Sequence, residues 1–190
     1  LGNGLLEIGQ YDDALSVKET HLATLRRLDA DKQNILDVQG NLAVTYATLE
    51  RYELALRMKR IVYSGYLKLK GEEHTDTLIS ANNYVDSLIQ LQRYKTVMSL
   101  LRKTLPIARR VLGEDHHLTL RMRFNYARAL HQDPAATLDD LREAVTTLED
   151  AERTARRVLG SAHPDVASIE KSLRNARAVL RARETPSSSA

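Results

Sequence analysis

The stretch NLAVTYATLERYELAL, residues 41–56, decides the fold of this chain because the chain repeats it. NYVDSLIQLQRYKTVM at residues 83–98 aligns with it without gaps, and NYARALHQ at residues 125–132 aligns with its first half. An interval of 42 residues separates the three leading asparagines, Asn41, Asn83 and Asn125. A segment that returns at a fixed interval indicates a repeat protein in which each copy is one structural unit.

Each unit contains two helical patterns. In the first, Leu42, Ala43, Tyr46 and Leu49 fall on one face of a helix of 3.6 residues per turn. The second begins near the tyrosine of the Arg-Tyr pair and runs to a glycine, and its apolar side in the third unit consists of Val97, Leu100, Leu101, Leu105, Ala108, Val111 and Leu112. Neither helix can bury its apolar face alone, so the pattern predicts an all-α solenoid of stacked helix pairs.

The composition supports helices and excludes several classes of protein. Of 190 residues, 43% are hydrophobic and only 5% aromatic, and 8 glycines and 4 prolines are too few for the turns of an all-β fold. The absence of cysteine excludes disulfides and thiolate zinc sites and favours a reducing, cytoplasmic location. No stretch approaches the roughly 20 apolar residues of a membrane span, and we expect no membrane partner.

Three acidic, histidine-containing segments recur between the units, and each admits a metal, a proton-transfer or a purely structural interpretation. They are GEEHTDTL (71–78), GEDHHLTL (113–120) and GSAHPDVA (160–167). Because there is one such segment per unit, their histidines should lie far apart, and His116 with His117 supplies too few ligands for a metal. We therefore interpret the segments as turns and predict no metal site.

Local signals in these turns predict how the helices end and begin. The glycines Gly71, Gly113 and Gly160 are expected to adopt the left-handed conformation that closes a helix. The expected N-cap residues of the following helices are Thr75, Asp76 and Asp165, and Pro164 fits a first-turn position.

The repeat predicts about nine helices in a single array over residues 1–184. The expected units are residues 1–34, 35–75, 76–116 and 117–163, followed by a terminal helix at 164–184 and a disordered tail at 185–190. The first residue, Leu1, suggests a fragment of a longer protein.

The fourth unit is about five residues longer than the others. In HQDPAATLDDL (131–141), Pro134 should end the preceding helix, and Leu141 occupies the position of the tyrosine in the other units. We expect these extra residues to form a longer, more exposed loop within the unit.

The residues resemble a known family. Leu42-Ala43-x-x-Tyr46 followed by Tyr52-x-x-Ala55 matches the L-G-x-x-Y and Y-x-x-A features of tetratricopeptide repeats. With NLA, RY and LGSAHP (159–164), the chain is similar to the long-repeat subtype of kinesin light chains from its start to about Arg183. The light chains also have a coiled coil, but no sustained heptad occurs here, so we do not transfer the motor function.

The resemblance implies a right-handed superhelix whose first helices line a concave groove for an extended peptide or a partner helix. In that family an asparagine on the groove-lining helix typically forms hydrogen bonds with the backbone of a bound peptide. The matching positions are Asn41, Asn83 and Asn125.

The residues themselves indicate the same surface, opposite the apolar face of each first helix. This face carries Asp37, Asn41, Val44 and Thr48 in the second unit, Ile79, Asn83, Asp86 and Gln90 in the third, and Arg121, Asn125, Arg128 and Gln132 in the fourth. Amides both donate and accept hydrogen bonds and so suit an extended backbone, and the two arginines would favour acidic residues near one end of the partner. The alternative is that these side chains form a solvated face or assist packing.

The sequence therefore predicts a non-catalytic protein–protein interaction module, with a regulatory or self-assembly scaffold as the alternative. The oligomeric state stays open. No Ser/His/Asp set, phosphate-binding loop or isolated carboxylate pair indicates an enzyme, and we expect no cofactor. Nucleic acid is not an expected partner, because the net charge is only +3 and the arginine-rich runs fall at helix ends, where they complement the helix dipole.

Overall fold

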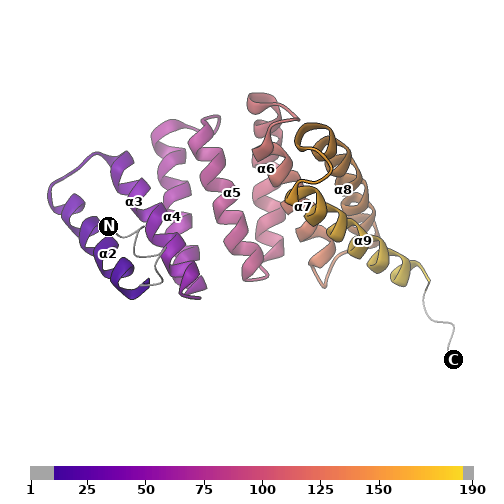
Figure 1. The fold of residues 1–190 in the computed structure, drawn as a ribbon, viewed down its shortest axis with the longest axis horizontal. Helices are drawn as coiled ribbons and strands as arrows, with labels where there is room; N and C mark the ends of the chain where they lie inside the picture. Colours follow the sequence, from indigo (N-terminus) through magenta and orange to yellow (C-terminus); the bar gives the residue numbers. More distant parts are fainter. Residues whose placement is uncertain (1–10, 186–190) are drawn as a thin grey trace. The chain divides into compact units, whose positions relative to one another are not determined.

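The computed structural model describes residues 11–185, and within that range every regular element is an α-helix (Figure 1). The helices are α2 (Tyr11–Arg27), α3 (Lys32–Thr48), α4 (Tyr52–Lys70), α5 (Thr75–Gln90), α6 (Tyr94–Leu112), α7 (His117–Gln132), α8 (Leu138–Leu159) and α9 (Pro164–Glu184). They form two compact units, α2 to α5 before residue 92 and α6 to α9 from residue 92 onward. The ninth expected helix and most of the expected tail lie outside the described residues.

In the first unit, each helix packs against the next one along the chain. The predicted apolar face of α3 is confirmed, because Leu42 and Ala43 are buried and Tyr46 and Leu49 are partly buried. A cluster of Leu15, Leu22 and Leu42 joins α2 to α3, while Leu36, Val62 and Tyr66 join α3 to α4. Every helix thus obtains its buried face from its neighbours, as a helical repeat requires.

In the second unit, α7 packs against α6 and α8, and α9 packs mainly against α8 and also contacts α7. The predicted side of α6 is largely correct, since Val97, Leu101, Leu105 and Ala108 are buried. Val111 is an error in that prediction, because its side chain is exposed at the C-terminal end of α6. The buried face of α6 therefore has fewer residues in the last turn of the helix, just before the chain enters the next turn.

The turns between helix pairs use histidine, not the residues expected from the sequence, as the N-cap. In each turn the ring Nδ1 of one histidine accepts a hydrogen bond from the backbone N–H two residues later. The donor–acceptor distances are 3.1 Å at His74, 3.2 Å at His116 and 3.2 Å at His163. The N-cap prediction for Thr75, Asp76 and Asp165 is therefore wrong, because these residues already lie in the first helical turn. Pro164 does occupy the first turn of α9, as predicted.

The glycines that precede these histidines have positive φ, as predicted, but they are not in the left-handed helical region. Their φ values are 83, 92 and 86° and their ψ values 173, 162 and 153° at Gly71, Gly113 and Gly160. This extended region with positive φ is essentially accessible only to glycine. Each glycine still donates its N–H to the carbonyl oxygen four residues earlier, and the chain then leaves the helix in an extended conformation.

The loop within the fourth unit is longer than in the other units, as expected, but by less than the whole insertion. The loop of residues 133–137 is only two residues longer than the three-residue loops 49–51 and 91–93, and α8 is three residues longer than α4 and α6. Most of the insertion therefore extends a helix, which begins at the N-cap Thr137 with a capping box formed with Asp140. Arg183 holds the loop by donating hydrogen bonds to the carbonyl oxygens of Ala136 and Pro134 at 2.6 and 3.1 Å.

Acid should weaken the turn at His116 through the loss of its cap. A protonated Nδ1 cannot accept the N–H of Leu118. Within residues 11–185 no carboxylate is placed to compensate, since Asp115 pairs with Arg157 of α8 and Glu114 with Arg109 and Arg123. In contrast, Asp76 and Asp165 lie 3.6 and 3.8 Å from the ring nitrogens of His74 and His163.

Desolvation and the neighbouring His117 lower the pKa of His116, so the unfolded chain takes up this proton first and stability falls as the pH drops below about 6.5. Changing His116→Asn retains an N-cap acceptor that does not titrate. Between pH 8 and pH 5, we expect the free energy of unfolding to fall less in His116→Asn than in the unsubstituted protein. The difference should be at most about 1 kcal/mol, the usual contribution of a cap, and denaturation curves at the two pH values measure it. Equal losses in both proteins would contradict the capping role. His131, buried and also lowered in pKa, is present in both proteins and cancels.

Candidate functional site

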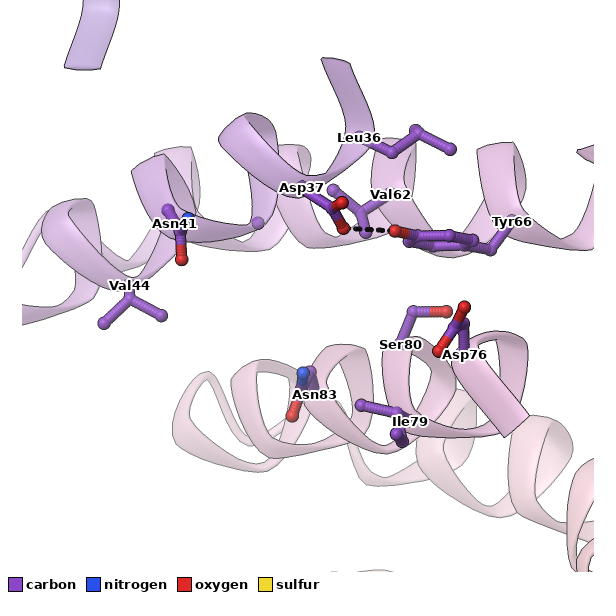
Figure 2. Close-up of a pocket in the computed structure, with 11 residues that line it drawn as sticks. Leu36, Asp37, Asn41, Val44, Val62, Tyr66, Asp76, Ile79, Ser80 and Asn83 are labelled. Atoms are coloured by element: carbon purple, nitrogen blue, oxygen red, sulfur yellow. Dashed lines mark hydrogen bonds between the residues drawn. The ribbon is translucent and has the colours of Figure 1, made fainter. Parts of the chain in front are cut away.

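A groove with a volume of about 260 Å³ lies between α3 and α5 in the first unit, with α4 at its base (Figure 2). We call it the α3–α5 groove. Its lining residues are Leu36, Asp37, Gly40, Asn41 and Val44 of α3, Val62 and Tyr66 of α4, and Asp76, Ile79, Ser80 and Asn83 of α5. The first helices of two successive repeats thus form its walls, and the second helix of the earlier repeat closes it underneath.

One end of the groove is a network of charged and hydroxyl groups. The hydroxyl of the buried Tyr66 donates a short hydrogen bond to Asp37, as Figure 2 shows. Lys70 donates to Asp76 at 2.6 Å, and its ammonium lies 5.4 Å from the centre of the Tyr66 ring. Burial, and then the Asp37 carboxylate, raise the pKa of Tyr66, so the phenol stays protonated and acts as a fixed donor.

The remainder of the groove presents amides and aliphatic groups to solvent. Asn41 and Asn83 are exposed on opposite walls, and Val44 and Ile79 are 52% and 42% exposed. Exposed aliphatic groups beside amides offer both apolar contact and hydrogen bonds to a molecule in the groove. Lys59 of α4 adjoins this part, beside Val44 and Asn83.

Gly40 lies in the middle of α3 and lines the groove. A glycine inside a helix costs about 0.5–1 kcal/mol relative to alanine. Packing does not require it here, because a Cβ at this position would have no atom within 4 Å. The missing side chain instead leaves room in the groove, where a backbone could approach closely.

The structure brings together some of the residues predicted from the sequence. Asn41, Val44 and Asn83 line the groove, together with Asp37 and Ile79 of the same predicted face. Thr48, Asp86 and Gln90 do not line it, and the hydroxyl of Thr48 donates to the carbonyl oxygen of Val44 at 3.1 Å. These three lie further along α3 and α5.

The four predicted residues of α7 belong to the second unit, and one of them is not on the surface. Asn125 is only 2% exposed and is engaged within the protein, so its expected exposure is wrong. Arg121 and Gln132 are exposed, and the guanidinium of Arg128 lies 5.5 Å from the centre of the Phe124 ring. Equivalent repeat positions therefore differ in environment, because helix packing around α7 differs from that around α3 and α5.

Tyr66, Asp76 and Gly40 were not anticipated as groove residues. Tyr66 comes from a second helix, whereas the predicted surface consisted only of residues on first helices. Gly40 could have been identified from the sequence, because a glycine inside a regular helical pattern usually has a packing or functional role.

The described residues offer neither a metal site nor a membrane-spanning helix. Residues 11–185 contain no group of three histidine, aspartate or glutamate side chains that could hold a metal ion. Over the same range, none of the helices combines the length and hydrophobicity that crossing a bilayer requires.

One segment of the chain matches a known sequence family. Residues 77–118, which span one 42-residue period, match the tetratricopeptide repeat sequence family. No curated protein matches the chain. The family match confirms the predicted tetratricopeptide repeat over residues 77–118.

Solved structures show the same fold over nearly the whole chain. One match is a substituted variant of nearly identical TPR-like repeats from a Podosopora anserina protein assigned as a kinesin light chain. Its TM-score is 0.80 at 21% identity, and the match covers 97% of this chain and 85% of that one. A second structure of these repeats matches with a TM-score of 0.71 and 20% identity, covering 98% and 94%. BtubC (BKLC) from P. vanneervenii has a TM-score of 0.73 and 17% identity, covering 100% and 82%.

These matches confirm the prediction of an all-α, tetratricopeptide-type solenoid, and the predicted similarity to kinesin light chain repeats agrees with the structures that share this fold. About nine helices were expected, and eight are found between residues 11 and 185. A repeat fold of this kind supports a protein–protein interaction or scaffold role in general, and such families are typically non-enzymatic.

Proposed function

We propose that this chain is a non-catalytic protein–protein interaction module that binds an extended peptide segment of its partner in the α3–α5 groove. The observation that carries the proposal is the coincidence of exposed Asn41 and Asn83 on opposite walls with the open space at Gly40. A helix gains no stability from such a glycine, and the space lies where a ligand backbone would pass.

The chemistry of the groove suits an extended backbone. A peptide that is not in a helix or sheet exposes both N–H and C=O groups, and an amide side chain can satisfy either. Val44 and Ile79 would contact an apolar side chain of the partner, which supplies affinity by removing apolar surface from water.

The preference for acidic partner residues that the sequence suggested at Arg121 and Arg128 has less support. Both arginines belong to the second unit, Arg121 is engaged within the protein, and Arg128 lies over Phe124. That preference stays a prediction, separate from the α3–α5 groove.

The proposal is tested by selecting random dodecapeptides against the full chain and measuring the affinity of the selected peptides by fluorescence anisotropy. We expect Asn41→Ala and Asn83→Ala each to weaken binding about threefold to tenfold, the usual effect of removing one hydrogen-bonding side chain. Asn34→Ala, an exposed asparagine of α3 outside the groove, is the matched control. Selected peptides that bind all three variants equally would show that the groove is not the binding site.

Self-assembly has one specific observation in its favour. Helix α4 carries four of the exposed large hydrophobic residues, Leu54, Ile61, Leu67 and Leu69. Light scattering over a concentration series distinguishes the two functions, because a dimer that dissociates on Ile61→Glu would support assembly, whereas a monomer at all concentrations would support an external partner.

A further inference from the structure

The charge of the α3–α5 groove is unbalanced. Among its eleven lining residues only two are charged, Asp37 and Asp76, and both are acidic. Asp76 is compensated by Lys70 at 2.6 Å. In residues 11–185 the partner of Asp37 is the hydroxyl of Tyr66, and no basic side chain forms an ion pair with it.

Asp37 is also held in place. Its carboxylate accepts the hydrogen bond of Tyr66, whose ring is buried between α3 and α4, so the carboxylate is fixed at the groove wall. Figure 2 shows the two aspartates on facing walls at the Tyr66 end. Ser80 on the α5 wall directs its hydroxyl to the carbonyl oxygen of Thr77 at 2.9 Å, so within the described residues it does not serve Asp37 as a second partner.

The opposite end of the groove, at Val44 and Asn83, has no carboxylate among its lining residues. Lys59 adjoins Asn83 and Val44 there. A cationic ligand group would be attracted to the Asp37 end, which gives the groove an electrostatic direction.

We propose that the Asp37 end of the groove binds a lysine or arginine side chain of the partner peptide, and that an aliphatic side chain of the same peptide contacts Val44 and Ile79. This inference rests on the proposed function of the groove. On α3, Asp37 and Val44 are seven residues apart, or about 10 Å along the axis. An extended chain advances about 3.3 Å per residue, so the basic and aliphatic residues should be separated by two to four positions.

The test uses a fluorescein-labelled dodecapeptide selected against the full chain, with each of its basic residues replaced in turn by citrulline or norleucine. We expect one replacement to weaken binding about threefold to tenfold, as for a partly exposed ion pair, and the difference to shrink at high salt. Asp37→Asn, which preserves the acceptor for Tyr66, should cause the same loss and make the peptide insensitive to that replacement. Asp13→Asn on α2, outside the groove, is the charge-matched control.

The outcomes separate the two proposals. Peptides whose affinity depends on Asn41 and Asn83 but not on a basic residue or on Asp37 would overturn the inference and leave the proposed function intact. Peptides that ignore the two asparagines would overturn both. If Asp13→Asn and Asp37→Asn weakened peptide binding equally, the loss would come from the net charge of the protein and not from the groove. That result would also contradict the inference.

Discussion

Replacing Leu141 by alanine is expected to lower the free energy of unfolding by about 3–5 kcal/mol, because it leaves a cavity in a fully buried site. Leu141 is in the second turn of α8, the helix that packs on both α7 and α9. Since consecutive helices of a repeat protein support one another, loss of this contact should destabilise the whole second unit. Urea denaturation followed by circular dichroism measures the change.

Two further variants of α8 sharpen this prediction. Leu138→Ala, at the exposed start of the same helix with 37% of its side chain accessible, should cost less than about 1 kcal/mol. Leu141→Tyr would restore the residue of the other repeats, yet it should also destabilise by about 1–3 kcal/mol, because Tyr52 and Tyr94 are half-buried helix starts and Leu141 is enclosed. A neutral Leu141→Tyr would mean that the site is not tightly packed.

Substitution of Gly40 should separate stability from binding. Gly40→Ala is expected to raise the free energy of unfolding by about 0.5–1 kcal/mol, because the position is helical and open. Gly40→Phe, which fills the groove, should weaken peptide binding by more than about tenfold, since the ligand backbone and the ring would compete for the same space. Thermal denaturation and fluorescence anisotropy measure the two effects.

Asn34→Phe is the matched control for Gly40→Phe, because it adds the same ring to the same helix outside the groove. It should leave peptide affinity within about twofold of the unsubstituted protein. Gly40→Phe with unchanged affinity would contradict the proposed path of the ligand, whatever its effect on stability.

The repeat register made the helices and their pairing predictable from the sequence. The Leu42–Tyr46 pattern and the Arg-Tyr pairs locate α3, α4, α5 and α6, because apolar periodicity is a local property that packing then uses. The histidine caps were not predicted, since serine, threonine and aspartate are the usual N-caps and lie in the same turns. Only the structure shows that the ring Nδ1 of His74 accepts the backbone N–H of Asp76 and so caps the helix.

The groove was partly predictable for a different reason. Asn41 and Asn83 share a helix face, which the sequence reveals, and the structure places both beside one groove. Asn125 has the same repeat position but is buried, because burial depends on neighbours that the period does not specify. The bond between Tyr66 and Asp37 joins residues 29 positions apart, so no local pattern could indicate it.

The central claim is that the α3–α5 groove is where this protein holds its partner, and amide resonance mapping with a selected peptide tests it most directly. We expect the resonances of Gly40, Val44, Ile79 and Asn83 to shift on titration, while those of the exposed residues of α4 and of the second unit stay nearly unchanged. Shifts confined to α4 or to residues 92–190, with the groove resonances unmoved, would contradict it.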